Sequence, residues 1–584
     1  MKTMCRWTGL LAMVLSACTP SYDVVIVGGG ASGVAAGIQA ARSGAKTLIV
    51  EETPWLGGML TSAGVSAVDG NYNLRGGIFG EFCDSVAARY GGYDKIATGW
   101  VSRILFEPHV GDAIFKNMAA REKNLTIEYG RTFADVKGLK YKILIDATEL
   151  GDVAAQLGVP CHVGMDASSR TGEDIAPQQA NDIVQDLTYV AILKDYGPDA
   201  DMTLPMPDGY DRSLYVNSCI NPLNTGVEPD PASGKLVKSD TRQLLWSPSM
   251  MLTYGLLPVQ EAGDTARRPA KYMVNWPGDG NDFYANVVDM SPAERAAVLD
   301  SAKRVTLGFI YFIQTELGRK NLGLADDEYP TADRLPFYPY YRESRRIEGE
   351  VAFIVDHAAR PYDFRLYRTG IGVGDYPVDH HHYRNPDWMK LPRLAFYPIP
   401  SYSIPLGVMI PKGVDNLLVV EKSVSVSNLL NGTTRLQPVV MQVGQAAGVL
   451  AALAVRNRCP LREVKVREVQ AALLDAGGYL MPYLDLPKDD PHFKALQRIG
   501  ATGIMRGTGR NVGWSNQTWF RAADPMTAED LFLEEYYPGK TPAELGLPAI
   551  DAAQPMTRGA YAAAVDSLLH PFESFDVSLA GDLL

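Results

Sequence analysis

Cysteine is scarce in this chain of 584 residues, which contains six. None of them forms a CxxC pair or the spacing of an iron–sulfur ligand set, so the sequence predicts neither a metal cluster nor a redox-active dithiol. Four cysteines follow the N-terminal segment, and they allow two disulfides in an oxidising compartment without requiring them. These are Cys83, Cys161, Cys219 and Cys459.

Runs of basic residues are also absent. The chain has 55 lysine and arginine residues against 67 aspartate and glutamate residues, for a formal net charge of −12. Nucleic-acid-binding proteins gather positive charge on one face or segment, so no nucleic-acid partner is expected. With 46% hydrophobic and 21% charged residues, the composition is that of a globular protein.

A long apolar run occurs at residues 436–455, which read LQPVVMQVGQAAGVLAALAV and carry no charge. The run is long enough to span a bilayer. It contains three glutamines and a proline, however, and it is dominated by alanine and glycine. We therefore predict a buried helix that packs closely against a flat partner, not a membrane span.

The first 18 residues have the pattern of a secretory signal. Lys2 and Arg6 form a basic region, residues 7–15 are apolar, and the sequence Leu-Ser-Ala-Cys that ends at Cys18 resembles the bacterial lipobox. This segment is too short to be a spanning helix. It predicts a lipoprotein located in the periplasm or at the outer membrane, attached to the membrane only through lipid on Cys18.

The stretch from Asp23 to Glu51 predicts a dinucleotide site. An apolar β-run ends in the motif Gly28-x-Gly30-x-x-Gly33, a helix of small residues follows, and a second β-run ends at Glu51. In such a unit the glycines allow a tight turn and close approach to a diphosphate at the helix N-terminus. The acid is placed to bind a ribose hydroxyl.

The residues after this unit favour FAD. Glu52 is followed by Gly57-Gly58-Met59 and a threonine, which looks like the Gly-Gly extension of glutathione-reductase-type FAD enzymes. That resemblance implies that the Gly-Gly pair brings the backbone close to the flavin side of the cofactor.

The pattern of the sequence then changes twice. Strand and helix patterns continue to about residue 164, whereas residues 165–400 are rich in Pro, Tyr, Asn and Asp and contain an amphipathic helix at about 292–319. A β-run and the uncharged helix return in residues 401–480. We predict an α/β protein with a discontinuous Rossmann-like FAD-binding domain (22–164 and 401–480), an inserted mixed α+β substrate domain (165–400) and a small helical C-terminal module.

The C-terminal module, residues 485–584, contains a short internal repeat. Pro525-Met526-Thr527 recurs as Pro555-Met556-Thr557, and each threonine is expected to cap a short helix. The pattern resembles S-layer-homology modules, which attach proteins to polysaccharide. A plain helical appendage that stabilises the enzyme is the alternative.

Over residues 22–480 the chain resembles the bacterial FAD-dependent oxidoreductase family that includes secreted proteins labelled xanthan-lyase-like. The resemblance rests on the Gly28–Glu51 unit and on a set of short motifs spread over the rest of this range. The motifs are Gly57-Gly58-Met59, Phe106-Glu107-Pro108-His109, residues 146–152 (DATELGD), 342–347 (RESRRI), 372–376 (GVGDY), 410–419 (IPKGVDNLLV) and 444–448 (GQAAG).

The resemblance implies FAD as the cofactor. It places residues 146–152 near the diphosphate and Asp152 near the ribityl chain, and it starts a flavin-facing helix at Gly444, whose N-terminal dipole would stabilise the reduced ring. The residues expected to bind FAD are Gly28, Gly30, Ala31, Ser32, Gly33, Glu51, Glu52, Gly57, Gly58, Met59, Thr148, Gly151, Asp152, Gly444, Gln445 and Ala446.

Two positions depart from the family pattern. Val420-Glu421-Lys422 stands where the family usually has Ala-Gly-Arg, and Glu149 stands where the usual Asp-Ala-Thr-Gly step has its glycine. These departures affect the fine geometry of the cofactor site.

Candidate catalytic residues lie in the later part of the chain. In the run Asp379-His380-His381-His382, His380 and His382 share one face of an extended segment and could supply a base or a hydrogen-bond donor. No metal site is expected. Arg435 precedes the uncharged helix, which makes the loop 431–435 the preferred substrate contact.

Two further basic motifs are candidates for substrate binding. The group Arg342, Arg345 and Arg346 could clamp an anionic substrate such as a uronate, or could form a surface salt-bridge cluster. Arg75-Gly76-Gly77 is a weaker candidate.

The sequence therefore predicts an envelope-anchored FAD-dependent oxidoreductase. We expect it to transfer hydride between flavin N5 and a small-molecule or saccharide substrate, anionic if the arginines bind it. The alternative is a non-redox lyase, or a glycan-binding surface protein, in which FAD is structural. Substrate identity and oligomeric state are not encoded in these motifs.

Overall fold

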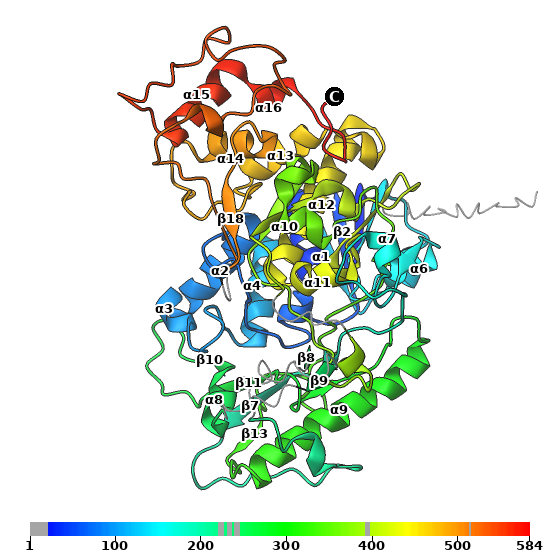
Figure 1. Cartoon of the computed structure of the whole chain (residues 1–584). Helices are drawn as coiled ribbons and strands as arrows, with labels where there is room; N and C mark the ends of the chain where they lie inside the picture. Colours follow the sequence, from blue (N-terminus) through cyan, green and yellow to red (C-terminus); the bar gives the residue numbers. More distant parts are fainter. Residues whose placement is uncertain (1–20, 220–226, 230–235, 239–245, 392–396, 513–515) are drawn as a thin grey trace, which may run out of the picture.

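The computed structural model describes residues 21–219, 227–229, 236–238, 246–391, 397–512 and 516–584. The predicted signal segment and lipobox, residues 1–18, lie outside the described residues. Figure 1 shows the cofactor domain at the centre, the inserted domain at one end and the C-terminal module at the other.

A five-stranded parallel sheet of order β17-β4-β1-β2-β3 forms the centre of the cofactor domain. Its strands are β1 (Val24–Val27), β2 (Thr47–Glu51), β3 (Leu125–Tyr129), β4 (Ile143–Asp146) and β17 (Leu417–Val419). All residues of β1, β2, β4 and β17 are buried, as expected of strands that are covered on both faces. Because β17 comes from late in the chain and pairs with β4, the domain is discontinuous, as predicted.

Two helices of small residues, α1 (Ala31–Arg42) and α12 (Gln437–Asn457), pack closely against each other. A Cβ atom added to Gly444 would lie 2.1 Å from the carbonyl oxygen of Ser32, and one on Gly448 would lie 2.4 Å from that of Ala36. The uncharged stretch is thus a buried helix, as predicted. Within the described residues α12 is long and apolar enough to cross a membrane, but 94% of its most apolar window is buried in the protein.

Replacing Gly444 by alanine should therefore destabilise the fold. The added methyl group has no space against the α1 backbone, and overpacking of this kind costs about 1–3 kcal/mol in the free energy of unfolding. Gly138→Ala is the matched control, because no atom lies within 4 Å of its added Cβ. Urea unfolding should show a lower midpoint for Gly444→Ala alone, and equal midpoints for the two variants would contradict this packing.

The inserted domain is built on a four-stranded antiparallel sheet of order β10-β11-β7-β13 and a long helix, α9 (Pro292–Thr315). The strands are β7 (Ala191–Asp195), β10 (Leu256–Leu257), β11 (Lys271–Val274) and β13 (Leu322–Leu324). Ser291 and Glu294 form a capping box that starts α9 at the predicted place. This is the mixed α+β domain that the sequence predicted (Figure 1).

The C-terminal module contains α14 (Phe493–Thr502), α15 (Arg558–Leu569), α16 (Pro571–Ser574) and a hairpin of β18 (Thr508–Arg510) and β19 (Gln517–Trp519). The two copies of the short repeat lie side by side, since the N–H of Met526 donates to the carbonyl of Met556 at 2.8 Å. Thr527 and Thr557 both cap helical turns, as predicted. The apolar residues of this module are continuous with the core of the cofactor domain.

Other elements complete the fold. The helices are α2 (Gly77–Tyr90), α3 (Tyr93–Ile96), α4 (Pro108–Ala120), α5 (Phe133–Val136), α6 (Asp152–Gln156), α7 (Ser168–Thr171), α8 (Pro248–Thr253), α10 (Val355–Ala359), α11 (Asn428–Thr434) and α13 (Val466–Asp475). Two-stranded pairs are β5 (Cys161–His162) with β14 (Arg346–Ile347), β6 (Leu187–Thr188) with β12 (Asp282–Phe283), β8 (Val227–Pro229) with β9 (Leu236–Lys238), and β15 (Gly370–Gly374) with β16 (Tyr402–Pro405). The four cysteines of the described residues, Cys83, Cys161, Cys219 and Cys459, are free thiols.

Candidate functional site

A cavity of about 510 Å³ lies at the carboxyl ends of β1, β2 and β4, where open α/β sheets bind their ligands. Gly28 and Gly30 line it. Gly28 has a φ of +100°, which a side chain would not tolerate, and a Cβ on Gly33 would lie 1.9 Å from the Gly28 carbonyl oxygen. Gly28 therefore makes the tight turn, and Gly33 allows the close packing of the helix, as the sequence predicted.

Glu51 holds the loop around this cavity. Its Oε2 accepts the N–H of Gly29 at 2.6 Å, while its Oε1 accepts the N–H and the hydroxyl of Thr53 at 2.8 and 2.7 Å. Burial raises the pKa of Glu51 to about 7, although these hydrogen bonds oppose the shift. Glu51 and Glu52 both line the cavity, and the predicted contact with a ribose stays a prediction.

The Gly57-Gly58 pair lies against the glycine-rich turn. The N–H of Gly57 donates to the carbonyl of Gly29 at 2.9 Å, and a Cβ on Gly58 would lie 2.7 Å from the Cα of Gly30. Both glycines have positive φ angles, +107° and +54°. Met59 follows in a short 3₁₀ turn, η1 (Gly58–Leu60), and is fully buried.

The predicted residues after β4 reach the same cavity. Thr148 and Asp152 line it, and Asp146 accepts hydrogen bonds from the N–H and hydroxyl of Thr148 at 3.0 and 2.7 Å. Asp152 forms ion pairs with Arg295 at 3.0 Å and with Arg345 at 2.8 Å. Arg295 and Arg345 therefore balance the negative charge of the Asp152 carboxylate.

The residues at the N-terminus of α1 fit the diphosphate of an adenine dinucleotide. The hydroxyl of Ser32 is buried and has no hydrogen-bond partner within the described part of the chain, so it is available to a phosphate oxygen. Ala31 is fully buried, and the nearest atom to a Cβ on Gly30 is 3.5 Å away. One donor is taken: the N–H of Ser32 donates to Oε2 of Glu421 at 2.9 Å.

The prediction for Gly444, Gln445 and Ala446 is wrong about where the helix starts. α12 begins at Gln437, with Pro438 in its first turn, so Gly444 lies about two turns inside the helix. Gly444 contacts the α1 backbone, Gln445 donates to Oε1 of Gln39 at 2.9 Å, and Ala446 is buried in the core. The small size of Gly444 and Ala446 serves helix packing in this structure.

A second cavity, of about 110 Å³, lies where the inserted domain meets the N-terminus of α12. Leu436, the N-cap of α12, lines it, so the positive end of the helix dipole is directed toward this space. Val65, also in its wall, donates its N–H to the carbonyl of Met59 at 3.0 Å, which connects this cavity to the Gly57–Met59 segment. Aromatic rings form much of the wall: Trp100, Trp246, Tyr254, Trp276, Tyr340 and Tyr376.

Charged side chains alternate around this aromatic cavity. Arg435, 2% exposed, donates to the Tyr340 hydroxyl at 2.5 Å and pairs with Oδ2 of Asp379 at 3.4 Å. That carboxylate also accepts from Nε2 of His381 at 2.9 Å. Burial alone would lower the pKa of His381, but Asp379 and the nearby Asp282 raise it. Although burial would raise the pKa of Asp379, His381 and Arg435 hold it well below its usual range.

Asp69 differs from Asp379 in this cavity. Burial, together with the nearby charge of Asp379, raises its pKa to about 6, against a hydrogen bond from Ser102 at 2.9 Å and the charges of Arg435 and His381. A carboxyl group with this pKa changes its charge close to neutral pH, as a general base requires. No motif in the sequence marked Asp69, because the residues that surround it come from far away in the chain.

His380 and His382 do share a face, but that face does not line the second cavity. Their rings stack with centroids 5.4 Å apart, and Nε2 of His380 contacts the carbonyl oxygen of Leu429 at 2.9 Å. Burial lowers the pKa of His380 to about 4 and lowers that of His382 well below its usual value. The histidine that lines the cavity is His381, between the two that the sequence favoured.

Of the three arginines in the predicted anion clamp, Arg342 lines the aromatic cavity. Arg345 pairs with Asp152 and Asp289, and Arg346 pairs with Glu343 at 2.6 Å and Asp166 at 3.3 Å. These ion pairs are buried on the arginine side, so the alternative of a surface salt-bridge cluster is wrong for Arg345 and Arg346, whereas Arg342 stays a candidate for binding an anion. Arg75 donates to the carbonyl of Tyr72 and lies over the ring of Tyr93.

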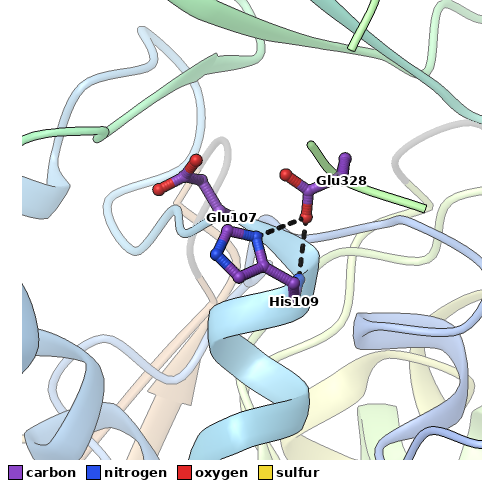
Figure 2. A group of neighbouring side chains, drawn as sticks. All are labelled: Glu107, His109 and Glu328. Carbon is purple, nitrogen blue, oxygen red and sulfur yellow. Dashed lines mark hydrogen bonds and ion pairs between the residues drawn. The ribbon is translucent and has the colours of Figure 1, made fainter. Parts of the chain in front are cut away.

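Three potential metal ligands, Glu107, His109 and Glu328, lie together at the start of α4, outside both cavities (Figure 2). Lys271 already supplies a cation there: its Nζ lies 2.6 Å from Oε1 of Glu107 and 3.1 Å from Oε2 of Glu328. Burial would lower the pKa of Lys271, but the two carboxylates raise it, so it stays charged. This arrangement is a buried ion-pair cluster in which Lys271 supplies the positive charge for both carboxylates.

Comparison with known proteins identifies the cofactor chemistry. The family model described as FAD dependent oxidoreductase matches residues 23–473. An NADH:fumarate oxidoreductase of Klebsiella pneumoniae (strain 342) is 48% identical over 60 residues, which is 10% of this chain and 6% of that protein. The chain thus spans only a small part of the length of that relative.

Solved structures with distant likeness include a flavin-dependent enzyme and an enzyme bound to FAD. A flavin-dependent brominase has 12% identity and a TM-score of 0.32, with 83% of this chain and 86% of that chain covered. A halogenase in complex with FAD has 11% identity and a TM-score of 0.31, with 83% and 80% covered.

Proposed function

The chain belongs to the family of FAD-dependent oxidoreductases, and from that premise we propose that it oxidises or reduces a small carbohydrate-derived acid in the aromatic cavity. The observation that carries this proposal is the pairing in one cavity of Asp69, whose pKa is about 6, with the cations Arg435 and Arg342. Bound FAD supplies the two-electron step, accepting or returning a hydride.

Asp69 would handle the proton of the reaction. When a substrate hydroxyl is oxidised to a carbonyl, its C–H bond gives up a hydride and its O–H bond gives up a proton. Asp69 in its ionised form can accept that proton, and in its protonated form it can return it for the reverse reaction. The raised pKa makes both forms accessible near neutral pH.

The other polar groups would bind and orient the substrate. Arg435 keeps an unpartnered buried Nε within the described part of the chain, and Asn275, 8% exposed, has an Oδ1 without a partner there. The first can donate to a substrate carboxylate, and the second can accept from a hydroxyl. A cavity of about 110 Å³ favours a monomer or the end of a longer molecule over a large ligand.

The aromatic wall suits a ring with apolar faces and polar edges. Trp246 lies edge-on to Trp100 and Trp276, with ring centroids 5.4 and 5.0 Å away, and Tyr254 lies edge-on to Trp276 at 5.4 Å. Such rings exclude water and leave hydrogen bonding to the charged groups, which strengthens those interactions.

The visible spectrum of the purified protein tests this proposal. Bound oxidised FAD should bleach on anaerobic addition of a uronic acid, and the neutral sugar of the same ring should bleach it far more slowly. A preparation that cannot take up FAD would remove the oxidoreductase assignment. FAD that stays oxidised with every sugar acid would favour the alternative, a lyase or glycan-binding protein with structural FAD.

We also propose that the protein is anchored in the bacterial envelope by lipid on Cys18. The support is the sequence of residues 1–18 and the position of Tyr22, whose N–H donates to the carbonyl of Lys140 at the start of the folded domain. Cys18→Ser should move the protein from the detergent phase to the aqueous phase in a Triton X-114 partition. Cys459→Ser is the control, and retention of Cys18→Ser in the detergent phase would contradict anchoring at this residue.

The resemblance of the C-terminal module to S-layer-homology domains, and the placement of the chain among xanthan-lyase-like members of the family, stay predictions. The continuity of the module's core with that of the cofactor domain supports the alternative that it stabilises the enzyme.

A further inference from the structure

Three charged side chains meet at the N-terminus of α1, where the diphosphate of a dinucleotide binds. Oε2 of Glu421 accepts the N–H of Ser32 at 2.9 Å, and its Oε1 lies 3.2 Å from Nζ of Lys422. Lys422, with a side chain that is 0% exposed, also contacts Oε2 of Glu149 at 2.6 Å. The other oxygen of Glu149 lies 3.5 Å from the position of a Cβ on Gly30.

These residues are the same two departures from the family pattern that the sequence showed. Glu149 and Lys422 are separated by 273 positions, yet they form one buried ion-pair group with Glu421. Glu421 has a φ of +58°, a left-handed conformation that favours glycine. A glutamate held in this conformation at a ligand site indicates that its side chain has a role there.

The group carries two carboxylates and one ammonium. Burial raises the pKa of Glu149, and Glu421 adds to that shift while Lys422 opposes it. Burial would lower the pKa of Lys422, but Glu149 and Glu421 raise it. The N-terminus of α1 thus already holds an anion, supplied by its own chain, at one of the N–H groups that a diphosphate would use.

We propose that Glu421 is an internal ligand of the phosphate-binding site, which FAD must displace before its diphosphate can bind. Lys422 then transfers its charge from Glu421 to the incoming phosphate, because the two anions compete for one cation and one helix N-terminus. The inference rests on the proposed use of FAD.

A filled anion site would allow the chain to fold and persist without its cofactor. The Glu421 carboxylate satisfies the N–H of Ser32 and complements the helix dipole, so α1 has a stable N-terminus in the absence of FAD. A protein exported before it receives FAD would need this property.

Binding of FAD to the cofactor-free full-length protein tests the proposal, with quenching of FAD fluorescence as the signal. Glu421→Gly removes the competing carboxylate and should lower the Kd for FAD at least 10-fold, equivalent to about 1.4 kcal/mol. In the unmodified protein the observed association rate should level off at high FAD concentration, because release of Glu421 precedes binding. In Glu421→Gly it should rise linearly.

Two further variants distinguish the effect of the Glu421 carboxylate at the N–H of Ser32 from a general effect of negative charge on FAD binding. Glu421→Gln keeps the shape and removes the charge, so it should also tighten binding, by a smaller factor. Glu128→Gln removes an exposed carboxylate that pairs with Arg131 in the wall of the same cavity and makes no contact with Ser32, and it should change the Kd less than 3-fold. Unchanged or weaker binding in both Glu421 variants, or equal tightening by Glu128→Gln, would overturn the proposal.

Inorganic pyrophosphate distinguishes failure of this proposal from failure of the proposed function. Calorimetry should show tighter pyrophosphate binding to Glu421→Gly than to the unmodified protein. If that difference is found while no variant binds FAD, the internal ligand stands and the assigned cofactor use fails. If FAD binds and pyrophosphate shows no difference, the internal ligand is overturned.

Discussion

Asp69→Asn should lower kcat by about 10²–10⁴-fold, the loss expected when a general base is removed. The substitution preserves shape and the hydrogen bond from Ser102, so the aromatic cavity should keep its form. In the unmodified enzyme kcat/KM for substrate oxidation should rise with pH through about 6, where the carboxyl group ionises. The variant should lack that rise, because asparagine does not titrate.

Asp375→Asn is the matched control for this result. Burial also raises the pKa of Asp375 to about 6, and its carboxylate accepts the N–H of Asn71 at 2.6 Å, but it does not line the cavity. Its variant should keep the pH dependence of kcat/KM. A pH profile that loses its step in Asp375→Asn and keeps it in Asp69→Asn would remove Asp69 as the base.

Asp69→Asn should lower the activity of the enzyme but raise its stability as pH rises. A carboxyl group whose pKa is raised by folding binds more protons in the folded state, so its contribution to stability is present at low pH and is lost as pH rises through about 6. Asparagine avoids that loss. The Tm of Asp69→Asn relative to the unmodified enzyme should therefore increase between pH 5 and pH 8.

Lys271→Met should reduce the free energy of unfolding by about 3–5 kcal/mol, because it leaves the buried carboxylates of Glu107 and Glu328 without their shared cation. Lys271 is 3% exposed, so water cannot replace it. Chemical denaturation at pH 7 would measure the change. Adding Glu107→Gln to the variant should recover part of it, since one of the two unpaired charges is then gone.

Lys194→Met provides the comparison, since Lys194 lies directly opposite Lys271 across the β11–β7 pair. It pairs with Asp326 and Asp327, whose side chains are exposed, and its loss should cost about 0–1 kcal/mol. The stability of the unmodified protein should also be indifferent to EDTA. A large drop with EDTA would mean that the group in Figure 2 holds a metal and that Lys271 is not its cation.

The dinucleotide-binding turn could be predicted because it is local. Gly28, Gly33 and Glu51 act on backbone within thirty positions of one another, so spacing alone assigns their roles. The late strand β17 and the buried helix α12 were also predictable, from a β-run and an uncharged run of small residues. The start of α12 was predicted wrongly, although Pro438 in its first turn is a local signal for a helix start.

The aromatic cavity could not be predicted, because it is assembled from distant segments. Asp69, Trp100, Tyr254, Arg342 and Arg435 come from separate loops, and their approach depends on how the inserted domain packs. In the run 380–382, alternation correctly grouped the two outer histidines. Alternation could not decide which face of the segment turns toward the cavity. In the structure His381 lines the cavity, which is the position that the sequence predicted for His380 and His382.

The late return of β17 and α12 also has a consequence for biosynthesis. Contacts that join Gln39 to Gln445, 406 positions apart, cannot form until almost the whole cofactor domain has been made. Pairings over such separations make folding slow and leave apolar strands exposed in the meantime. We therefore expect the nascent first half of this chain to depend on chaperones, and a truncation before residue 437 to leave the face of α1 that α12 covers exposed.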